Sequence, residues 1–378
     1  MKITNIFLLV TDITLDGGVE RVVCNMANSF AERNYNVVII SMFSANQSLN
    51  YQFRKNIKIE IIKGGIGRVT WMNKHTSRIN LIRRYQTSVH FTRLIYAIID
   101  QYSKGGKSVL LTNSYLYATP LYRHRNVHII GLDHSRYPFG NMTGGIRHWL
   151  HTYMIRKFDV VTTLNEDELD KWKSIGPPVY IMPNFLPQNW INNNASTSKR
   201  NKVIVSMGRM NTNQKGFDRL IEAYSLIAAK HPDWKLNIYG SGCLQKEYRQ
   251  LINDLNMQDF IEIFDFTKNP LAVYQTASIY AMCSREEGFP MVLLEAGCQG
   301  LPIISYDIQF GPRTLIKDTV TGFIIPDGNK EKFAESLEKL MNDDNLREKM
   351  SENIRKDIPA RFSEEVIIDK WIKIIEEL

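Results

Sequence analysis

Two glutamates in one short stretch have the types and spacing that most directly suggest chemistry. Glu287 and Glu295 are separated by seven residues, within the sequence Ser-Arg-Glu-Glu-Gly-Phe-Pro-Met-Val-Leu-Leu-Glu-Ala. The apolar run from Ile279 to Cys283 precedes them and predicts a strand. Pro290 suits the first turn of a helix, because its missing N–H would have no partner there. We therefore expect Glu287 in a loop and Glu295 in the helix that follows.

The start of this predicted helix has the properties of a phosphate site. The N–H groups near Met291 and Val292 lack acceptors within a helix, and the positive end of the helix dipole lies there. Glu295 follows at roughly 8 Å along the axis, a distance that can separate a nucleotide's phosphate from its ribose. A carboxylate accepts two hydroxyl hydrogen bonds, so Glu295 suits a ribose and Glu287 the hydroxyls of a sugar. The alternative is a surface helix residue and a solvated loop charge.

Two cations follow another predicted strand. After the strand that ends at Met207 the chain reads Gly-Arg-Met-Asn-Thr-Asn-Gln-Lys-Gly, which places Arg209 and Lys215 in a short connection before a helix. In an open parallel sheet, ligands bind beyond the carboxyl ends of the strands. Arg209 and Lys215 can therefore neutralise a pyrophosphate as it leaves, a task that needs no proton transfer. Each cation taken singly also fits a solvated loop.

Two weaker candidates lie in the first half of the chain. Asp16-Gly17-Gly18 falls in the first expected strand-to-helix turn, where glycine lets the backbone approach a ligand closely. His134 follows the expected strand from Val127 to Leu132, and from there it can reach the ligand from the other domain. Gly-Gly turns and single histidines are also common where no ligand binds.

The elements that must position these residues alternate between short β-branched strands and helices. This pattern is typical of a mainly parallel sheet covered by helices on both faces. In the first half we expect a helix from Val19 to Glu32 and strands at Ile6 to Val10, Val37 to Met42, Ile57 to Ile62, Ser108 to Thr112, Val127 to Leu132, Val160 to Thr163 and Val179 to Met182. In the second half we expect a helix from Asp218 to Lys230 and strands at Val203 to Ser206, Lys235 to Tyr239, Ile261 to Phe264, Ile279 to Cys283, Ile303 to Ser305 and Gly322 to Ile325. The fold class is therefore α/β, with two doubly wound domains.

A polar stretch divides the two halves. Leu186 to Asn201 is rich in Asn and Ser and lacks apolar periodicity, which is typical of a domain boundary. Two domains also suit a chain of 378 residues, because single cores stop growing at about 250 to 300 residues. We therefore expect domains at residues 1–185 and 202–360, a linker at 186–201 and a C-terminal segment at 361–378. Within that segment, Glu364 to Leu378 has mostly helical apolar spacing and predicts an amphipathic helix.

The charge is unevenly distributed along the chain. Residues 1–190 hold 23 Lys and Arg against 12 Asp and Glu, which gives +11, and the remaining 24 against 27 give −3, for a net charge of +8. The asymmetry favours an anionic partner for the first domain, although a solvated basic surface has the same pattern. No nucleic-acid motif accompanies it, so nucleic acid is not an expected partner.

One basic stretch also suits a membrane surface. The segment from Arg68 to Arg93 interleaves cations with apolar residues, which fits peripheral contact with an anionic membrane or a lipid-linked acceptor; the residues are Arg68, Trp71, Lys74, Arg78, Leu81, Ile82, Arg83, Arg84, Tyr85, Phe91 and Arg93. An ordinary surface helix packed by its apolar face has the same pattern. We find no run of about 18 apolar residues and no export signal, so we expect a cytoplasmic protein. If the basic stretch binds a membrane, we expect peripheral contact with the inner face of the cytoplasmic membrane. The cysteines lack zinc or disulfide spacing and are expected to be reduced; they are Cys24, Cys243, Cys283 and Cys298.

The sequence resembles the family four glycosyltransferases with the GT-B fold. The resemblance is strong in the second half and looser between residues 45 and 125. It is carried by Gly17-Gly18-Val19-Glu20-Arg21-Val22, Ile181-Met182-Pro183-Asn184, Gly208-Arg209, Lys215-Gly216, Glu287-Gly288-Phe289-Pro290 through Glu295-Ala296, Gly300-Leu301-Pro302, Gly311-Pro312-Arg313 and Gly322-Phe323. The resemblance implies two Rossmann-like domains that face a central cleft. The first binds the acceptor, the second binds the nucleotide-sugar, and the C-terminal helix packs back towards the first.

The resemblance also implies a role for each site residue. Donor-sugar hydroxyls fall to Glu287 and the ribose to Glu295, whereas Arg209 and Lys215 hold the diphosphate. His134 is expected beside the transferred sugar and completes a catalytic set with Arg209, Lys215 and Glu287. The implied substrate contacts are Gly17, Gly18, Gly288, Phe289, Pro290, Met291, Val292, Leu293, Glu295 and Phe266. Asp265, just before Phe266, departs from the glycine that the family often has there.

The reaction implied by the resemblance is retaining transfer of a hexose from a UDP-sugar to a saccharide or lipid-linked saccharide acceptor. The matching segments look most like bacterial transferases that build lipopolysaccharide or capsule from UDP-galactose, UDP-glucose or their N-acetyl forms. No Asp-x-Asp is present, so we expect no metal and no cofactor, with Arg209 and Lys215 in place of a metal ion. The alternatives are a GT-B UDP-sugar epimerase and, more remotely, a nicotinamide-dependent enzyme. For the latter, Gly240-Ser241-Gly242 follows a strand but Gln245 replaces the third glycine.

Overall fold

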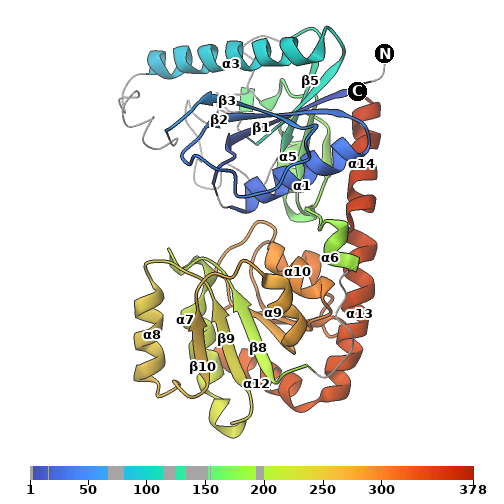
Figure 1. Cartoon of the computed structure of the whole chain (residues 1–378). Coiled ribbons are helices and arrows are strands. Elements are labelled where there is room, and N and C mark those ends of the chain that lie inside the picture. The colour runs from blue at the N-terminus through green and yellow to red at the C-terminus, as the bar shows by residue number, and fades with distance from the viewer. Residues whose placement is uncertain are drawn as a thin grey trace. The chain divides into compact units, whose positions relative to one another are not determined.

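The computed structural model describes residues 3–15, 17–66, 81–113, 124–132, 152–153, 155–192 and 200–378. The chain divides into two compact units, Met1–Asn184 with Glu365–Leu378 and Phe185–Glu364. Each unit is built around its own parallel sheet (Figure 1). The α/β class with two doubly wound sheets, which the sequence predicts, is therefore confirmed.

Seven parallel strands form the sheet of the first unit, in the order β3-β2-β1-β4-β5-β6-β7. The strands are β1 (Asn5–Asp12), β2 (Asn36–Phe43), β3 (Lys58–Lys63), β4 (Ser108–Thr112), β5 (Val127–Leu132), β6 (Val160–Thr163) and β7 (Val179–Ile181). Leu8 of β1 pairs with Ile39 of β2 on one side and with Leu111 of β4 on the other. The strand order therefore reverses at β1, which is the position where doubly wound sheets bind ligands.

Helices cover both faces of this sheet. They are α1 (Gly18–Glu32), α3 (Leu81–Ser103), α5 (Leu169–Lys173), α14 (Glu364–Glu376) and the 3-10 turn η1 (Glu166–Glu168). Figure 1 shows α1 and α3 on opposite sides of the strands. The α14 helix buries the apolar side predicted for it, including Ile367 and Trp371. Its Asp369 forms an ion pair at 3.7 Å with Arg33, the C-cap residue of α1. Within the described ranges, no helix has both the length and the apolar character needed to cross a bilayer.

Part of the predicted membrane-facing stretch belongs to the core. Phe91 of α3 is fully buried, and its ring meets Phe43 of β2 edge to face at 6.0 Å between centroids. The prediction that Phe91 contributes to a membrane surface is therefore wrong, because its side chain packs against the sheet. Arg93 is exposed, two residues further on. Residues 67–80, which include Arg68, Trp71, Lys74 and Arg78, lie outside the described residues.

Six parallel strands form the sheet of the second unit, in the order β10-β9-β8-β11-β12-β13. The strands are β8 (Val203–Met207), β9 (Lys235–Tyr239), β10 (Ile261–Phe264), β11 (Ile279–Met282), β12 (Ile303–Asp307) and β13 (Gly322–Pro326). The helices are α6 (Gln188–Asn192), α7 (Phe217–Ser225), α8 (Gln245–Asp254), α9 (Pro270–Thr276), α10 (Met291–Cys298), α11 (Pro312–Leu315), α12 (Lys330–Asn342) and α13 (Asp344–Phe362), with 3-10 turns η2 (Asn213–Lys215) and η3 (Ala228–Lys230). The single helix expected from Asp218 to Lys230 is thus divided into α7 and η3. The order reverses between β8 and β11, so these two strands mark the switch point.

The stretch expected as a linker contains a short helix. The α6 helix lies inside residues 186–201, and the whole of Phe185–Glu364 clusters as one unit. Leu186 is buried, and the carbonyl of Trp190 accepts a hydrogen bond from the Gln299 side chain at 2.8 Å. Trp190 therefore attaches the stretch to the end of α10, and the N–H of Leu186 attaches it to the carbonyl of Phe362 at the end of α13, at 3.4 Å. Residues 193–199 lie outside the described residues.

Candidate functional site

The candidate site lies at the carboxyl edge of the second sheet, where two loops leave neighbouring strands. Residues 208–216 follow β8, and residues 283–290 follow β11. β8 and β11 pair in register, with Ile204 opposite Ile279 and Val205 opposite Tyr280. Both loops therefore start side by side at the switch point of the sheet. The first carries Arg209 and Lys215 and the second carries Glu287, as the sequence predicts.

Lys215 and Glu287 form an ion pair between the two loops. The Lys215 Nζ donates to Glu287 Oε1 at 2.6 Å, and the two side chains are only 18% and 8% exposed. The Ser284 hydroxyl donates to the same Oε1 at 2.7 Å. Among the described residues no donor reaches Oε2 of Glu287, which leaves that oxygen available to a ligand hydroxyl. The alternative that Glu287 is a solvated loop charge is therefore wrong.

Glycines allow the two loops to come this close. The backbone at Gly216 has a φ of +64°, and a Cβ there would overlap the carbonyl oxygen of Cys283. At Gly208 a Cβ would lie 2.8 Å from Cγ of Lys215, against the stem of that side chain. These two glycines thus set both the spacing of the loops and the position of the Lys215 side chain.

A methyl group at Gly216 is expected to separate the loops. We predict that Gly216→Ala lowers the free energy of unfolding by about 1–3 kcal/mol, because alanine disfavours this positive φ and its Cβ has no room. Thermal or denaturant unfolding measures the effect. The matched control is Gly64→Ala, since a Cβ at Gly64 meets nothing within 4 Å. Equal unfolding midpoints for both variants would contradict this interpretation.

The start of α10 borders the Glu287 loop. The helix begins at Met291, with Pro290 as the N-cap residue, one position earlier than a first-turn proline. The N–H groups of Met291 and Val292 have no acceptor within the helix, as the sequence predicts for an anion site. The N–H of Leu293 already donates to the Pro290 carbonyl at 2.9 Å, and the Leu293 side chain is buried. The amide donors that remain for a phosphate are therefore those at the very start of the helix.

Glu295 lies deeper in the same helix. Only 2% of its surface is exposed, so the alternative of a surface helix residue is wrong. The fully buried Tyr274 of α9 donates its hydroxyl to Glu295 Oε2 at 3.1 Å. A buried carboxylate held by a buried phenol has a defined orientation, which suits recognition of a diol.

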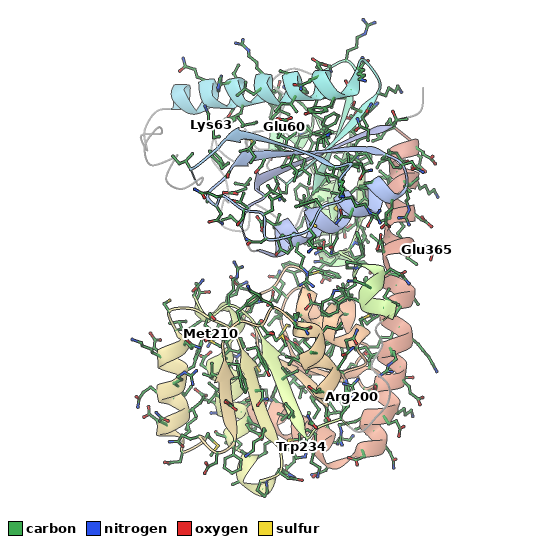
Figure 2. All side chains as sticks on the ribbon, in the orientation of Figure 1. Glu60, Lys63, Arg200, Met210, Trp234 and Glu365 are labelled. Carbon is green, nitrogen blue, oxygen red and sulfur yellow. The ribbon has the colours of Figure 1, made fainter. Side chains whose placement is uncertain are left out.

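The helices that carry Glu295 and Tyr274 are joined at their far ends by Arg200, which is labelled in Figure 2. Its guanidinium donates to the carbonyls of Tyr274 at 3.0 Å and Ala277 at 2.7 Å, and to that of Gln299 at 2.6 Å. The acceptors belong to the C-terminal ends of α9 and α10, where a cation also favours the helix dipoles. Burial, together with the charge of Arg355, lowers the pKa of Arg200 to about 10, so it stays charged at neutral pH.

The other predicted residues of the second unit differ in their exposure to solvent. Arg209 is exposed and makes no ion pair within the described part of the chain, so its charge is available to an anion. Phe266, just after β10, is 62% exposed, and its N–H donates to Ser241 Oγ at 3.1 Å. Asp265, the departure from the family pattern, accepts a hydrogen bond from Gln245 at 3.1 Å. Phe289 is buried, and its ring lies edge to face with that of Phe362 at 5.8 Å.

The first unit contains the other predicted candidates, of which the structure describes Gly17 and Gly18. Gly17 is the N-cap of α1 and Gly18 its first residue, directly after β1 at the switch point of that sheet. A Cβ on Gly17 would overlap the carboxylate of Glu20, whereas one on Gly18 would meet nothing within 4 Å. Asp16 and His134 lie outside the described residues, so the expected role of His134 stays a prediction.

Sequence reasoning assigned no role to several residues that hold the site together. Ser284 lies within the motif but its bond to Glu287 was not expected. Tyr274 and Arg200 precede the motif by many residues, and nothing local marks them as partners of Glu295 or α10. Among the described residues no three His, Cys, Asp or Glu side chains are grouped so that they could hold a metal ion.

Two doubly wound α/β units in one chain, each with its own parallel sheet, are the fold of a GT-B glycosyltransferase. The family described as "Glycosyltransferase Family 4" matches residues 16–188, and the family described as "Glycosyl transferases group 1" matches residues 188–357. The chain belongs to the family four glycosyltransferases. It is therefore a transferase of the glycosyl-transferring class.

Full-length relatives agree with this assignment. The chain is 28% identical over 383 residues to an uncharacterized glycosyltransferase of Haemophilus influenzae, covering 99% of this chain and 100% of the relative. It is 25% identical over 376 residues to the amylovoran biosynthesis glycosyltransferase AmsD of Erwinia amylovora, covering 98% and 99%. Anabaena HepE, solved in complex with UDP and glucose, has the same fold, with a TM-score of 0.74 at 15% identity over 99% of each chain. These matches give no support to the epimerase or nicotinamide alternatives.

Proposed function

We propose that this protein transfers a hexose from a UDP-sugar to a saccharide acceptor in the synthesis of a bacterial polysaccharide, with the anomeric configuration retained. The observation that carries the proposal is the 2.6 Å ion pair between Lys215 and Glu287. A cation and a carboxylate in contact suit a ligand in which phosphate and a hydroxylated ring are adjacent. A sugar nucleotide has that arrangement.

Each part of the donor has a matching group. An ammonium has three N–H donors, so Lys215 can keep its bond to Glu287 and still donate to the diphosphate. Arg209 supplies a second cation, and the N–H groups of Met291 and Val292 supply neutral donors. Glu295 accepts from the ribose diol, and the open Oε2 of Glu287 accepts from a hydroxyl of the hexose. The exposed ring of Phe266 is available to the base.

In this proposal the protein supplies position and charge. Lys215 and Arg209 stabilise the negative charge that grows on the diphosphate as the bond to the hexose breaks. The acceptor hydroxyl attacks from the face that the diphosphate leaves, and its proton passes to the leaving phosphate oxygen, so that the configuration is retained. This route needs no carboxylate nucleophile, which frees Glu287 to orient the sugar. We place His134 beside the transferred sugar.

The acceptor is proposed to bind the first unit. The name of AmsD, amylovoran biosynthesis glycosyltransferase, supports a saccharide acceptor in a biosynthetic pathway. The basic excess of residues 1–190 supports an acceptor that carries phosphate, such as a lipid-linked saccharide. Gly18 follows β1 at the switch point of that sheet, and a Cβ there would meet nothing within 4 Å, so the backbone at Gly18 is open to such a ligand.

A panel of UDP-sugars tests the proposal. UDP-galactose, UDP-glucose and their N-acetyl forms are compared for slow hydrolysis and for protection against thermal unfolding, with wild type and Glu295→Ala. We expect one or more to raise the unfolding temperature of the wild type, and Glu295→Ala to reduce that shift. Proton NMR of the product with an acceptor then shows an α-linkage from an α-donor. A wild type that recognises no UDP-sugar overturns the proposal, and an isomerised UDP-sugar without transfer indicates an epimerase.

Metal removal is expected to leave activity unchanged. Arg209 and Lys215 are the cations that the proposal assigns to the diphosphate, so transfer should proceed at the same rate in EDTA as in buffer with magnesium or manganese. Initial rates under the two conditions measure this. Complete dependence on an added divalent ion would contradict the assignment of the cations.

A further inference from the structure

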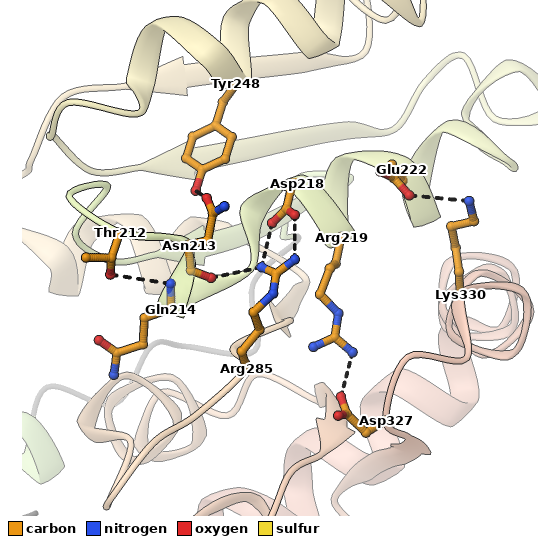
Figure 3. Close-up of polar contacts among 10 residues, drawn as sticks. All are labelled: Thr212, Asn213, Gln214, Asp218, Arg219, Glu222, Tyr248, Arg285, Asp327 and Lys330. Atoms are coloured by element: carbon orange, nitrogen blue, oxygen red, sulfur yellow. Dashed lines mark hydrogen bonds and ion pairs between the residues drawn. The ribbon is translucent and has the colours of Figure 1, made fainter.

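Arg285 connects the loop that carries Lys215 with the loop that carries Glu287 (Figure 3). Its guanidinium donates to both carboxylate oxygens of Asp218, at 2.8 and 2.6 Å, and to the carbonyl of Asn213 at 2.8 Å. Its backbone N–H donates to the carbonyl of Gln214 at 2.7 Å. Asp218 lies in the first turn of α7, and the two carbonyls belong to η2, which ends at Lys215.

Further bonds hold η2 in the same position. The Gln214 side chain donates to the carbonyl of Glu286 at 3.2 Å, and the Tyr248 hydroxyl donates to Asn213 Oδ1 at 3.2 Å. Figure 3 shows Tyr248 reaching η2 from α8 while Arg285 reaches it from the opposite loop. Lys215 directly follows Gln214, and Glu287 stands two residues after Arg285. Arg285 therefore constrains the positions of both Lys215 and Glu287, because each is one or two residues from a group that Arg285 holds.

The charges in this connection are stable near neutral pH. Burial opposes ionisation of Asp218, but the hydrogen bonds and charge of Arg285 outweigh it and lower the pKa of Asp218. The hydrogen bonds that Arg285 donates to Asp218 in turn raise the pKa of Arg285. Two parallel N–H···O bonds also fix the relative orientation of the two groups, which a single point charge does not do.

We propose that Arg285, through Asp218 and η2, is a positioning residue that holds Lys215 and Glu287 at the spacing that one donor molecule requires. The guanidinium is held by the Asp218 carboxylate and the Asn213 carbonyl, so we assign it an action on the donor through Lys215 and Glu287. The inference rests on the proposed function and adds to it a residue whose partners lie 67 and 72 positions away in the chain.

The spacing between Lys215 and Glu287 matters only for a ligand that contacts both residues. UDP contacts the cations and Glu295, whereas a UDP-hexose must also reach Glu287. Loss of Arg285 should therefore weaken use of the UDP-hexose more than binding of UDP. A displacement of about 1 Å at a reacting centre can cost about 100-fold in rate, so we expect a decrease of about 10- to 30-fold in kcat/KM for the UDP-hexose.

The test compares Arg285→Ala, Asp218→Ala, the double variant and Arg285→Lys, in the full-length protein. The probes are UDP and the UDP-hexose that the wild type uses. We expect each alanine variant to lose about tenfold or more in kcat/KM, and the double variant to lose no more than Arg285→Ala, because both residues act as one unit. UDP affinity should stay within about threefold. Arg285→Lys should recover activity only in part, since one ammonium cannot replace the bidentate guanidinium.

A matched control is the ion pair between α7, the helix of Asp218, and α12. Glu222 of α7 forms an ion pair with Lys330 at 3.3 Å, and no hydrogen bond or ion pair drawn in Figure 3 joins either residue to the two loops. Lys330→Ala should leave kcat/KM unchanged.

The double variant of Arg285 and Asp218 loses both partners of that ion pair, so it leaves no unpaired charge there. It therefore remains informative if Arg285→Ala folds poorly.

Several results would overturn the inference. These are unchanged kcat/KM in Arg285→Ala, losses that multiply in the double variant, or an equal loss of UDP affinity and UDP-hexose use. A wild type that uses no UDP-hexose is a different result, because it refutes the proposed function before any variant is compared.

Discussion

Replacing Lys215 with methionine is expected to lower kcat by about 100- to 1,000-fold, because the leaving diphosphate then loses a cation held in a mostly buried site. The side chain of Lys215 is 18% exposed, so water replaces its charge poorly. KM should change less than kcat, because the charge on the diphosphate grows towards the transition state. Steady-state kinetics with the preferred UDP-sugar measures both constants.

The lysine result needs two controls. Lys330→Met removes a lysine from the exposed ion pair with Glu222 and should leave kcat within about threefold of the wild type. Lys215→Met/Glu287→Gln removes both charges of the buried pair, so its unfolding temperature should exceed that of Lys215→Met while kcat stays low. A kcat for Lys215→Met close to that of the wild type would remove Lys215 from the reaction.

Replacing Glu287 with glutamine is expected to lower kcat/KM for the UDP-hexose by about 10- to 100-fold, because a charged acceptor contributes about 1.5–3 kcal/mol to a hydrogen bond. Glutamine keeps the size of the side chain and still accepts from Ser284. The affinity for UDP itself should stay close to that of the wild type, because the loss concerns the hexose. Competition by UDP against the UDP-hexose gives both quantities in one experiment.

The neighbouring carboxylate provides the control for this prediction. Glu286→Gln removes a charge one position away, while the backbone carbonyl that accepts from Gln214 remains. We expect kcat/KM to stay within about threefold of the wild type. Equal losses in both variants would mean that net charge of the loop, rather than a contact with the hexose, explains the result.

Much of the fold follows from local sequence. Strands at Ser108–Thr112, Val127–Leu132 and Lys235–Tyr239 have the predicted bounds, because short, mainly apolar runs between polar residues or glycines leave little choice of position. The polar segment at residues 186–201 is less predictable. Its contacts are made by Leu186 with Phe362 and by Trp190 with Gln299, and both partners come more than a hundred positions later in the chain.

The loops that form the candidate site can also be predicted from local sequence. Strand ends place loops at one edge of a parallel sheet, so Lys215 and Glu287 can be brought together from sequence alone. The hydrogen-bond partners of the site residues cannot be predicted in this way. Tyr274 meets Glu295 across a gap of 21 residues, and Arg285 meets Asp218 across 67. Such contacts depend on the packing of whole helices, which residue spacing does not encode.

The most direct measurement is a calorimetric titration of the wild type, Lys215→Met and Glu295→Ala with the UDP-sugar selected from the panel. We expect one site per chain in the wild type, and an affinity at least about tenfold weaker in each variant, since each loses a charged contact with a different part of the nucleotide. Unchanged affinity in both variants, in correctly folded protein, would place the donor elsewhere and contradict the assignment of the carboxyl edge of the second sheet.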